Sequence, residues 1–468
     1  MRDRIMLSGD GHLMSANSDN STRRTFLKDA ASGAAAGAFL FDIVPARVLG
    51  YQGEAPPSDT LNLGHIGIGG RGRRFLRPEA LANKSVPAPT NLGGDGSRIL
   101  RPARSMALCD VDSGRLDQAA TLVGGKPRLY RDFRRLLEDK DVDAVYIASP
   151  DHWHALQTIL ACQAGKDVYV EKPACNTIEE GRAMVNAAER YGRVVQVGSQ
   201  GRSQPAAWMA NNYIKAGRLG KVRKVTCWHY ASPAGDWTPD SPPPPEIDYD
   251  MWVGPARWLP YNVKHTHGAF RWMIDFGGGQ IRDRGAHVMS IANWIMDCDG
   301  TGPVSITATG EPPHDGMYDS AVTMEVTYEF KNPDWTLVWA QPGVPSTTLD
   351  ARYGAIYWGS NDNLTVTLGD GDGTATDQKA RDFAAQCDCG KAFRSPGHSE
   401  NFEDCIRTRE KPVMHMEAAH RVASLCVLGN IAFQLQRPLR WDPVNERFLN
   451  DDEANRLLSR PGRGSWHL

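Results

Sequence analysis

Apolar and polar positions alternate in blocks along residues 61–198. Short apolar runs lie at residues 61–68, 105–109, 144–148, 167–170 and 194–197, and segments with helical spacing separate them. This alternation is typical of βαβ units, which place their strands in one parallel sheet. Thr177 and Glu180 have the spacing of a capping box, and Gly192 follows where that helix should stop. We therefore predict a doubly wound α/β domain over residues 61–198.

The pattern changes after Gly198. A proline-rich stretch at residues 241–245 precedes three β-type alternations at 304–309, 321–330 and 335–339. Residues 399–433 have helical spacing, and the tail from Arg437 onward is predicted to be irregular. Together these features predict a C-terminal α+β domain with a mostly antiparallel sheet over residues 199–468. Residues 78–102 are interpreted as a loop inserted after a short first helix.

The first residues of the chain have the pattern of an export signal. Arg23 and Arg24 precede an apolar stretch at residues 30–44, which is shorter than the roughly 20 residues of a membrane span. We predict a twin-arginine signal region at residues 1–46 and a linker at 47–60. Twin-arginine signals lead to an exported, periplasmic location. Cleavage after Ala46 and retention as an anchor both stay open, and no other stable membrane span is expected.

Composition favours a small-molecule partner. The chain has 468 residues, with 53 Lys and Arg against 55 Asp and Glu, a net charge of -2. That balance gives no electrostatic reason to expect nucleic acid or an anionic membrane surface. Nine cysteines on a long chain are not a disulfide framework, and Cys387 and Cys389 form the only close pair. Neither this pair nor His265 and His267 has further ligands at metal-site spacing, so no metal is predicted.

A glycine fingerprint ends the first predicted strand. Gly67, Gly69 and Gly72 occupy the Gly-x-Gly-x-x-Gly positions of a Rossmann dinucleotide site, and Gly70 and Arg71 lie between them. Asp110 ends the second predicted strand, where an acidic residue receives the ribose hydroxyls. Its carboxylate would repel a 2′-phosphate, so NAD is predicted and NADP is less favoured. Alternatively, Asp110 and Asp112 only cap the helix that begins near Ser113.

Several further motifs follow in one order. These are Ser149-Pro150-Asp151-His152-Trp153-His154, Glu171-Lys172-Pro173, Gln196-Val197-Gly198, Asp283 with His287, and Asn401-Phe402-x-Asp404-Cys405. In this order the chain resembles the glucose-fructose oxidoreductase/inositol dehydrogenase (Gfo/Idh/MocA) family over nearly everything after Leu61. The resemblance implies an NAD(P)-dependent oxidoreductase that acts on CH–OH groups. It also implies a homo-oligomer, a dimer or a tetramer.

The resemblance assigns catalytic roles to Lys172, Asp283 and His287. Hydride leaves a carbinol carbon only as the hydroxyl proton is removed, so a base and a cation are both needed. His287 is the predicted acid/base and Lys172 its electrostatic partner. Asp283 lies four residues before His287, which on a helix places both on one face. The alternatives are a helix N-cap for Asp283, a core histidine for His287 and a solvated strand end for Lys172.

Other residues are predicted to line the site. By the resemblance, the cofactor also contacts Ser149, Pro150, His152, His154, Glu171 and Lys172. Residues able to bind a sugar through hydrogen bonds and stacking are Gln200, Arg202, Arg271 and Trp272. Each is equally compatible with an ordinary structural role. Ser290 and the 78–102 insertion depart from the family pattern and leave the substrate's hydroxyl pattern open.

Export restricts the chemistry, because no dependable pool of free nicotinamide exists outside the cytoplasm. We therefore expect tightly held NAD that is restored within each catalytic cycle, with a sugar or polyol substrate. One alternative is a redox-neutral glycoside-cleaving enzyme that oxidises and eliminates. A second is a non-catalytic sugar-binding protein on a dehydrogenase scaffold.

Overall fold

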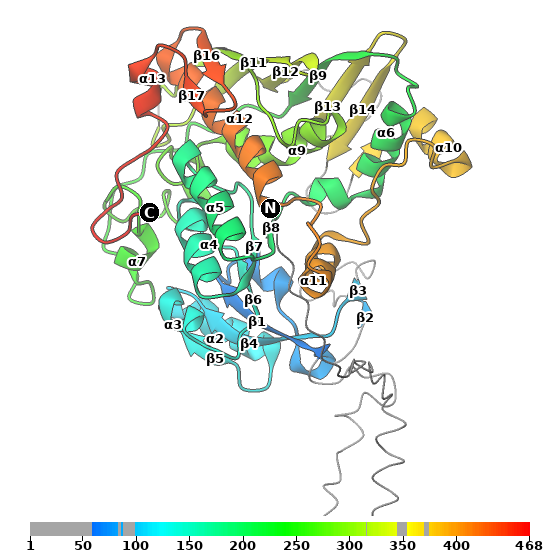
Figure 1. Cartoon of the computed structure of the whole chain (residues 1–468). Coiled ribbons are helices and arrows are strands. Elements are labelled where there is room, and N and C mark those ends of the chain that lie inside the picture. The colour runs from blue at the N-terminus through cyan, green and yellow to red at the C-terminus, as the bar shows by residue number, and fades with distance from the viewer. Residues whose placement is uncertain (1–58, 83–85, 88–98, 315, 344–352, 369–373) are drawn as a thin grey trace, which may run out of the picture.

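The computed structural model describes residues 59–82, 86–87, 99–314, 316–343, 353–368 and 374–468. The predicted signal region at 1–46 and the linker up to residue 58 lie outside these residues. The described chain folds into two sheets, each with its own helices (Figure 1). The predicted fold class is confirmed: a parallel Rossmann-like sheet precedes a sheet that is mostly antiparallel.

The first sheet contains six parallel strands. Their spatial order is β5 (Arg128–Tyr130), β4 (Ala103–Cys109), β1 (Leu61–Ile66), β6 (Ala144–Ile147), β7 (Asp167–Val170) and β8 (Val195–Val197). Chain order reverses beside β1, which is the switch point where ligands bind in doubly wound sheets. The strand β5 was not predicted, because only three residues form it and two of them are exposed.

Helices cover both faces of this sheet. One side holds α3 (Phe133–Leu137), α4 (His154–Gln163) and α5 (Ile178–Arg190), while α2 (Ser113–Val123) follows β4. The predicted capping box begins α5, with Thr177 and Glu180 bonded reciprocally to the backbone. The opposite face is covered by α11 (His398–Thr408), whose Phe402 packs against Tyr146 and Tyr169. A helix from the second half of the sequence thus completes the first core.

The second sheet has nine strands in the described chain. The order is β15 (Thr374–Thr376), β14 (Asn363–Leu368), β13 (Tyr353–Gly359), β9 (Val222–Trp228), β12 (Asp334–Gln341), β11 (Thr323–Lys331), β10 (Ser305–Glu311), β16 (Leu439–Asp442) and β17 (Arg447–Phe448). All neighbours are antiparallel except β9 and β12. The expectation of an irregular tail after Arg437 is wrong, because β16 and β17 extend this sheet and α13 (Asp452–Arg456) follows.

The second half of the chain also has its own helices. These are α6 (Pro205–Lys215), α7 (Tyr249–Val253), α8 (Gln280–Asp283), α9 (Gly285–Ile295), α10 (Gln378–Gln386) and α12 (Met416–Leu435). The long helix α12 takes part in both cores (Figure 1). Ala418 and Val422, near its start, pack in the core of the first sheet. Leu425 and Leu428, further along, pack in the core of the second.

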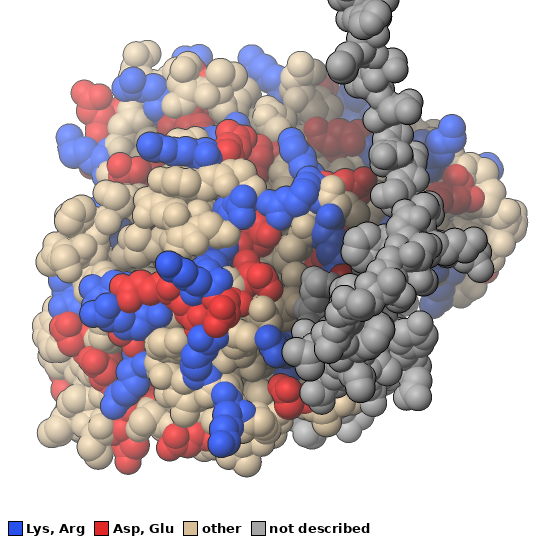
Figure 2. Space-filling model, turned by 60° about the horizontal axis from the view of Figure 1, so that its bottom comes forward, with Lys and Arg blue, Asp and Glu red and all other residues tan. Residues whose placement is uncertain are grey.

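Two surface features bear on the predicted partners. On the face that Figure 2 shows, acidic and basic side chains are interspersed, in keeping with the net charge of -2. None of the helices in the described chain combines the length and the apolarity that a membrane crossing requires. Cys387 and Cys389 form a local disulfide after α10.

Candidate active site

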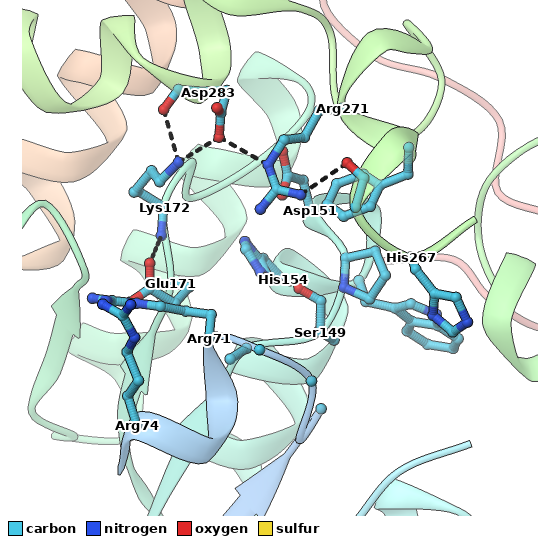
Figure 3. Close-up of a pocket in the computed structure, with 18 of the residues that line it drawn as sticks. Arg71, Arg74, Ser149, Asp151, His154, Glu171, Lys172, His267, Arg271 and Asp283 are labelled. Carbon is cyan, nitrogen blue, oxygen red and sulfur yellow. Dashed lines mark hydrogen bonds and ion pairs between the residues drawn. The ribbon is translucent and has the colours of Figure 1, made fainter. Parts of the chain in front are cut away.

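A cavity of about 770 Å³ lies at the carboxyl ends of the parallel strands, between the two halves of the chain. The first half contributes the glycine loop, Asp110 and the ends of β6 and β7. The second half contributes residues around η9 (His267–Trp272), the start of α9 and Tyr353. Figure 3 shows that side chains from both halves converge on this space. The cavity is large enough to hold part of a dinucleotide together with a small substrate.

The glycine loop connects β1 to a short 3₁₀ helix, η4 (Gly72–Phe75), rather than to a long helix. Gly67 has φ +81°, and a Cβ there would lie 2.5 Å from the Ser149 nitrogen. A Cβ on Gly72 would lie 1.9 Å from the Gly67 oxygen, so both positions need glycine for close packing. A Cβ on Gly70 would meet no heavy atom of the described chain within 4 Å. The loop therefore presents bare backbone to the cavity, as a pyrophosphate requires.

Asp110 lies where the ribose of a dinucleotide is expected. Its carboxylate accepts hydrogen bonds from the backbone nitrogens of Ile68 at 2.6 Å and Asp112 at 3.0 Å. Burial raises the pKa of Asp110, and these two donors oppose that shift. Asp112, not Asp110, caps α2 through the Arg115 nitrogen. The capping alternative thus applies to Asp112, and Asp110 lines the cavity.

The motif after β6 divides between the cavity and the core. Ser149, Pro150, Asp151 and His154 line the cavity. The His154 ring lies between two carbonyl oxygens, those of Pro173 at 2.7 Å and Ser149 at 2.9 Å, which fixes it as part of the wall. His152 is not among the described lining residues; its Nε2 lies 2.9 Å from the Trp252 carbonyl. His152 was predicted to contact the cofactor, but its ring instead contacts Trp252 of the second half of the chain.

Glu171 ties the glycine loop to the end of β7. Its carboxylate accepts from Arg71 Nε at 2.8 Å and from Gln200 Nε2 at 2.9 Å. Although burial opposes ionisation, Arg71 holds the pKa of Glu171 below its usual value. Figure 3 shows Arg71 and Glu171 together on one side of the cavity. Glu171 therefore positions Arg71 as well as lining the site.

Lys172 and Asp283 join the two halves at the centre of the cavity. Lys172 Nζ donates to Asp283 Oδ1 at 2.6 Å and to the Asp283 carbonyl at 2.8 Å (Figure 3). Arg271 Nε lies 3.0 Å from Oδ1, and Arg284 Nε lies 3.2 Å from Oδ2. Burial alone would raise the pKa of Asp283, but these three cations hold it well below its usual value. Asp283 is a carboxylate that holds Lys172 in place.

The helix that carries Asp283 and His287 is interrupted. Asp283 is the last residue of α8, Arg284 stands at the junction, and α9 begins at Gly285. Asp283 and His287 therefore belong to two short helices rather than to the one helix expected, although both face the same cavity. Asp283 is also not an N-cap, because Arg284 occupies that position without a side-chain cap. The interruption leaves both residues on the cavity wall while Asp283 faces the cations.

His287 lies in the first turn of α9 and lines the cavity. Burial, followed by the positive charge of Lys172, holds the pKa of its imidazole well below the usual value. The ring is therefore neutral near pH 7 and able to accept a proton. A neutral base next to a fixed ammonium is the arrangement that removal of a hydroxyl proton requires.

The predicted substrate residues are not all brought together. Gln200, Arg271 and Trp272 line the cavity. Arg202 is not among the described lining residues: its side chain is buried and bonds Asp299 at 2.7 Å and Ser290. The same contact occupies Ser290, the residue that departs from the family pattern. Lining residues that the sequence did not indicate for this site include His229, Tyr230, His267, Arg284 and Tyr353.

The fold and the cavity define a class of protein. A glycine loop at the switch point of a Rossmann sheet, an acidic residue after the second strand and an acid/base group across the cavity form a dinucleotide-dependent oxidoreductase site. Two family models match the chain: an oxidoreductase family NAD-binding Rossmann fold over residues 61–199, and the C-terminal alpha/beta domain over residues 221–335 and 390–468. The chain belongs to the Gfo/Idh/MocA oxidoreductase family.

Individual relatives agree with this assignment. An inositol 2-dehydrogenase of Klebsiella pneumoniae subsp. pneumoniae is 26% identical over 280 residues, which cover 56% of this chain and 77% of the relative. The WlbA dehydrogenase of Bordetella pertussis, solved with NADH and UDP-GlcNAcA, has a TM-score of 0.57 at 16% identity, covering 82% of this chain and 99% of that one. An aldose-aldose oxidoreductase of Caulobacter crescentus has a TM-score of 0.51 at 20% identity, covering 81% and 99%. The two structures show a shared fold.

Proposed function

We propose that this protein transfers hydride between a CH–OH group of a sugar or cyclitol and an NAD that stays bound through the cycle. The observation that carries the proposal is the neutral His287 imidazole beside the Lys172–Asp283 ion pair, in the cavity that also contains the glycine loop. The names of the relatives, an inositol dehydrogenase and an aldose oxidoreductase among them, support this substrate class.

Each protein group has one task in this chemistry. A bound nicotinamide would supply the hydride acceptor for oxidation of the carbinol carbon and the hydride donor for the reverse reaction. The His287 imidazole takes the hydroxyl proton as the carbon is oxidised and gives it back in the reverse direction. The Lys172 ammonium stabilises the negative charge that develops on that oxygen. Asp283 holds Lys172 and remains a carboxylate throughout, because three cations surround it.

Asp110 supports NAD as the cofactor. A carboxylate with two backbone donors still has lone pairs for ribose hydroxyls, whereas a 2′-phosphate at the same place would be repelled. On the substrate side, Trp272 and Tyr230 offer aromatic faces and Arg271 offers hydrogen-bond donors. Gln200 donates to Tyr169 and Glu171 and leaves its amide oxygen as an acceptor. This combination suits a ring that has both apolar faces and hydroxyl groups.

Export and assembly complete the proposal. The Arg23-Arg24 signal supports transport after folding, with the cofactor already in place. Because the cofactor stays bound, a second sugar or carbonyl substrate must take the hydride back. The alternation of buried and exposed positions along β11 leaves the outer face of this strand exposed, which supports the expected homo-oligomer.

Asp151 favours a second candidate function, redox-neutral glycoside cleavage. Its carboxyl group lines the same cavity and is buried, and burial raises its pKa. After transient oxidation of the carbinol, elimination removes the acidified proton of the neighbouring carbon while the glycosidic oxygen leaves with a proton, so the site needs a proton donor as well as a base. The Asp151 carboxyl group would serve as that donor.

The test begins with protein purified without added nucleotide. We would denature it, identify any released nucleotide by mass spectrometry, and then offer inositols, aldoses and nitrophenyl glycosides to the native protein. Retained NAD that is reduced in one turnover by a polyol, and reoxidised by an added sugar, is the expected result. Release of nitrophenol would select the glycosidase. Absence of retained nucleotide, with steady use of added NAD, would contradict the bound-cofactor cycle.

A further inference from the structure

A segment of the second half of the chain lies over the end of the cavity where Asp110 is found. This cover segment comprises residues 246–276 and includes α7 and η9. It has an apolar core formed by Ile247, Tyr249, Trp252, Val253, Ala256, Tyr261, Phe270, Met273 and Phe276, to which Tyr318 is added from a later part of the chain. A segment with a core of this size keeps its shape and does not act as a loose loop.

Backbone bonds attach the cover segment to the connection between β4 and α2. Ile247 forms an antiparallel bridge with Asp112, and the Ser113 nitrogen donates to the Glu246 carbonyl at 3.0 Å. The Asp248 nitrogen donates to the Val111 carbonyl at 3.0 Å. Arg131 Nη2 bonds the carbonyls of both Val111, at 3.0 Å, and Glu246, at 3.1 Å. The segment is thus fastened beside the residue expected to receive the ribose.

Eight residues of the cover segment line the cavity: Ile247, Met251, Trp252, His267, Gly268, Phe270, Arg271 and Trp272. His267 differs from the others in its backbone. Its φ is +51°, an angle that a histidine adopts only at a cost and only where its surroundings fix it. The turn before it is held by buried Asn262, whose carbonyl accepts from the nitrogens of His265 at 2.9 Å and Thr266 at 3.2 Å.

The His267 ring lies among groups of the dinucleotide-binding half. After burial, which lowers the pKa of its imidazole, the charges that act on it are those of Arg115 and Asp112 at the start of α2. Its Nδ1 is buried and has no hydrogen-bond partner in the described chain. In Figure 3 the ring stands across the cavity from Arg71 and Arg74. Nδ1 is enclosed by protein, so Nε2 is the ring nitrogen left for a ligand. A histidine held at a positive φ on the wall of a cavity indicates that its position serves a ligand there.

We propose that the cover segment is the second wall of the dinucleotide site and that His267 contacts the adenosine and diphosphate portion of the cofactor. The protein thereby encloses that portion between Asp110 and the glycine loop on one side and the second half of the chain on the other. This inference deepens the proposed function, on which it rests, because it names the part of the chain that slows cofactor release.

The test measures release and affinity rather than turnover. Protein loaded with NADH is mixed with excess ADP-ribose, and the loss of NADH fluorescence gives the dissociation rate. The affinity for ADP-ribose, which has the adenosine and diphosphate but no nicotinamide, is measured by calorimetry. His267→Gly removes the imidazole while glycine accepts the positive φ, so the fold is kept. Lys264→Ala is the matched control, since Lys264 precedes the same turn and is not a described lining residue.

For His267→Gly we expect NADH release to be about tenfold faster or more, and ADP-ribose binding to be weaker by a similar factor, because a hydrogen bond to a charged group is lost. Lys264→Ala should match the wild type. Arg131→Ala, which loosens the attachment, should also speed release. Equal rates for His267→Gly and wild type would overturn the inference. Fast release from the wild type itself would contradict the bound-cofactor cycle, while the ratio of ADP-ribose affinities would still decide the role of His267.

Discussion

Two buried clusters of charged residues lie between the first and second halves of the chain. They differ in whether a reactant can reach them. The open cluster, with Lys172, Asp283 and His287, lies on the wall of the cavity. The sealed cluster, with Arg77, Glu403 and His65, lies on the other face of the first sheet, where Arg77 pairs with Glu403 of α11. Each contains a histidine whose pKa is lowered by burial and by a neighbouring cation.

The comparison teaches that a perturbed pKa does not by itself identify a catalytic group. His65 Nε2 lies 2.8 Å from the Ser105 hydroxyl, and its ring stacks on Tyr146, so no reactant can reach it. His287 has a similar electrostatic environment but faces a space of substrate size. Access, more than the shift in pKa, separates a general base from a structural histidine.

The largest expected difference between the clusters is in activity. His287→Gln should lower kcat/KM about 10²–10⁴-fold, because the base that takes the hydroxyl proton is removed. His65→Gln should leave kcat/KM of the folded protein unchanged. Steady-state kinetics and thermal unfolding of both variants check this. A His287→Gln protein with wild-type kinetics would reject its role as the base.

The sealed cluster should dominate stability. Arg77→Met leaves Glu403 charged and unpaired in the core, which costs about 3–5 kcal/mol in the free energy of unfolding. Urea unfolding measures this loss. The double variant Arg77→Met/Glu403→Gln should recover much of it, since neither charge is then left alone. A single variant as stable as the wild type would show that the pair adds nothing to the fold.

Acid should weaken the sealed cluster through His65. The unfolded chain protonates His65 near pH 6.5, whereas the folded pKa is about 3. Between these values the unfolded state binds more protons, so stability falls as pH falls through that window. At pH 5 the share of His65 is on the order of 2 kcal/mol. Urea unfolding from pH 7.5 to 5 should show a shallower fall for His65→Gln; an equal fall would contradict this.

The smallest effect separates the two histidines spectroscopically. Lys172→Met removes the second-largest cause of the low pKa of His287, so that pKa should rise while the pKa of His65 stays constant. NMR titration of the imidazole protons, assigned with His287→Gln and His65→Gln, measures both. A constant pKa for His287 would show that burial alone sets it.

The parts of the site that local motifs specify could be predicted from the sequence. The glycine loop, Asp110 and Lys172 each follow a strand end, and strand ends of a parallel sheet meet at one edge. Thr177 and Glu180 form a cap within four residues, so no distant contact decides it. The two-sheet architecture followed in the same way from the change of hydrophobic period after Gly198.

What escaped prediction depends on partners that are distant in sequence. The strand β16 exists because Leu439 and Arg440 pair with β10 more than 130 positions earlier. The side chain of Arg202 could form hydrogen bonds with a sugar, but it is paired with Asp299 in the core. His267 stood out in the sequence only as half of a possible metal pair with His265, and the turn made by Asn262 brings it to the cavity. The direction of a side chain depends on tertiary contacts, so it cannot be predicted from the spacing of residues in the sequence.

The position of α12 limits how the molecule can move. Its first turns belong to the core of the parallel sheet and its later turns to the core of the second sheet. If one half rotated against the other, one end of α12 would leave its apolar environment. The stabilisation from burying that apolar surface would then be lost. We therefore expect no hinge at this joint. The cavity between the halves therefore keeps a fixed size, and it selects its ligands by size before any reaction begins.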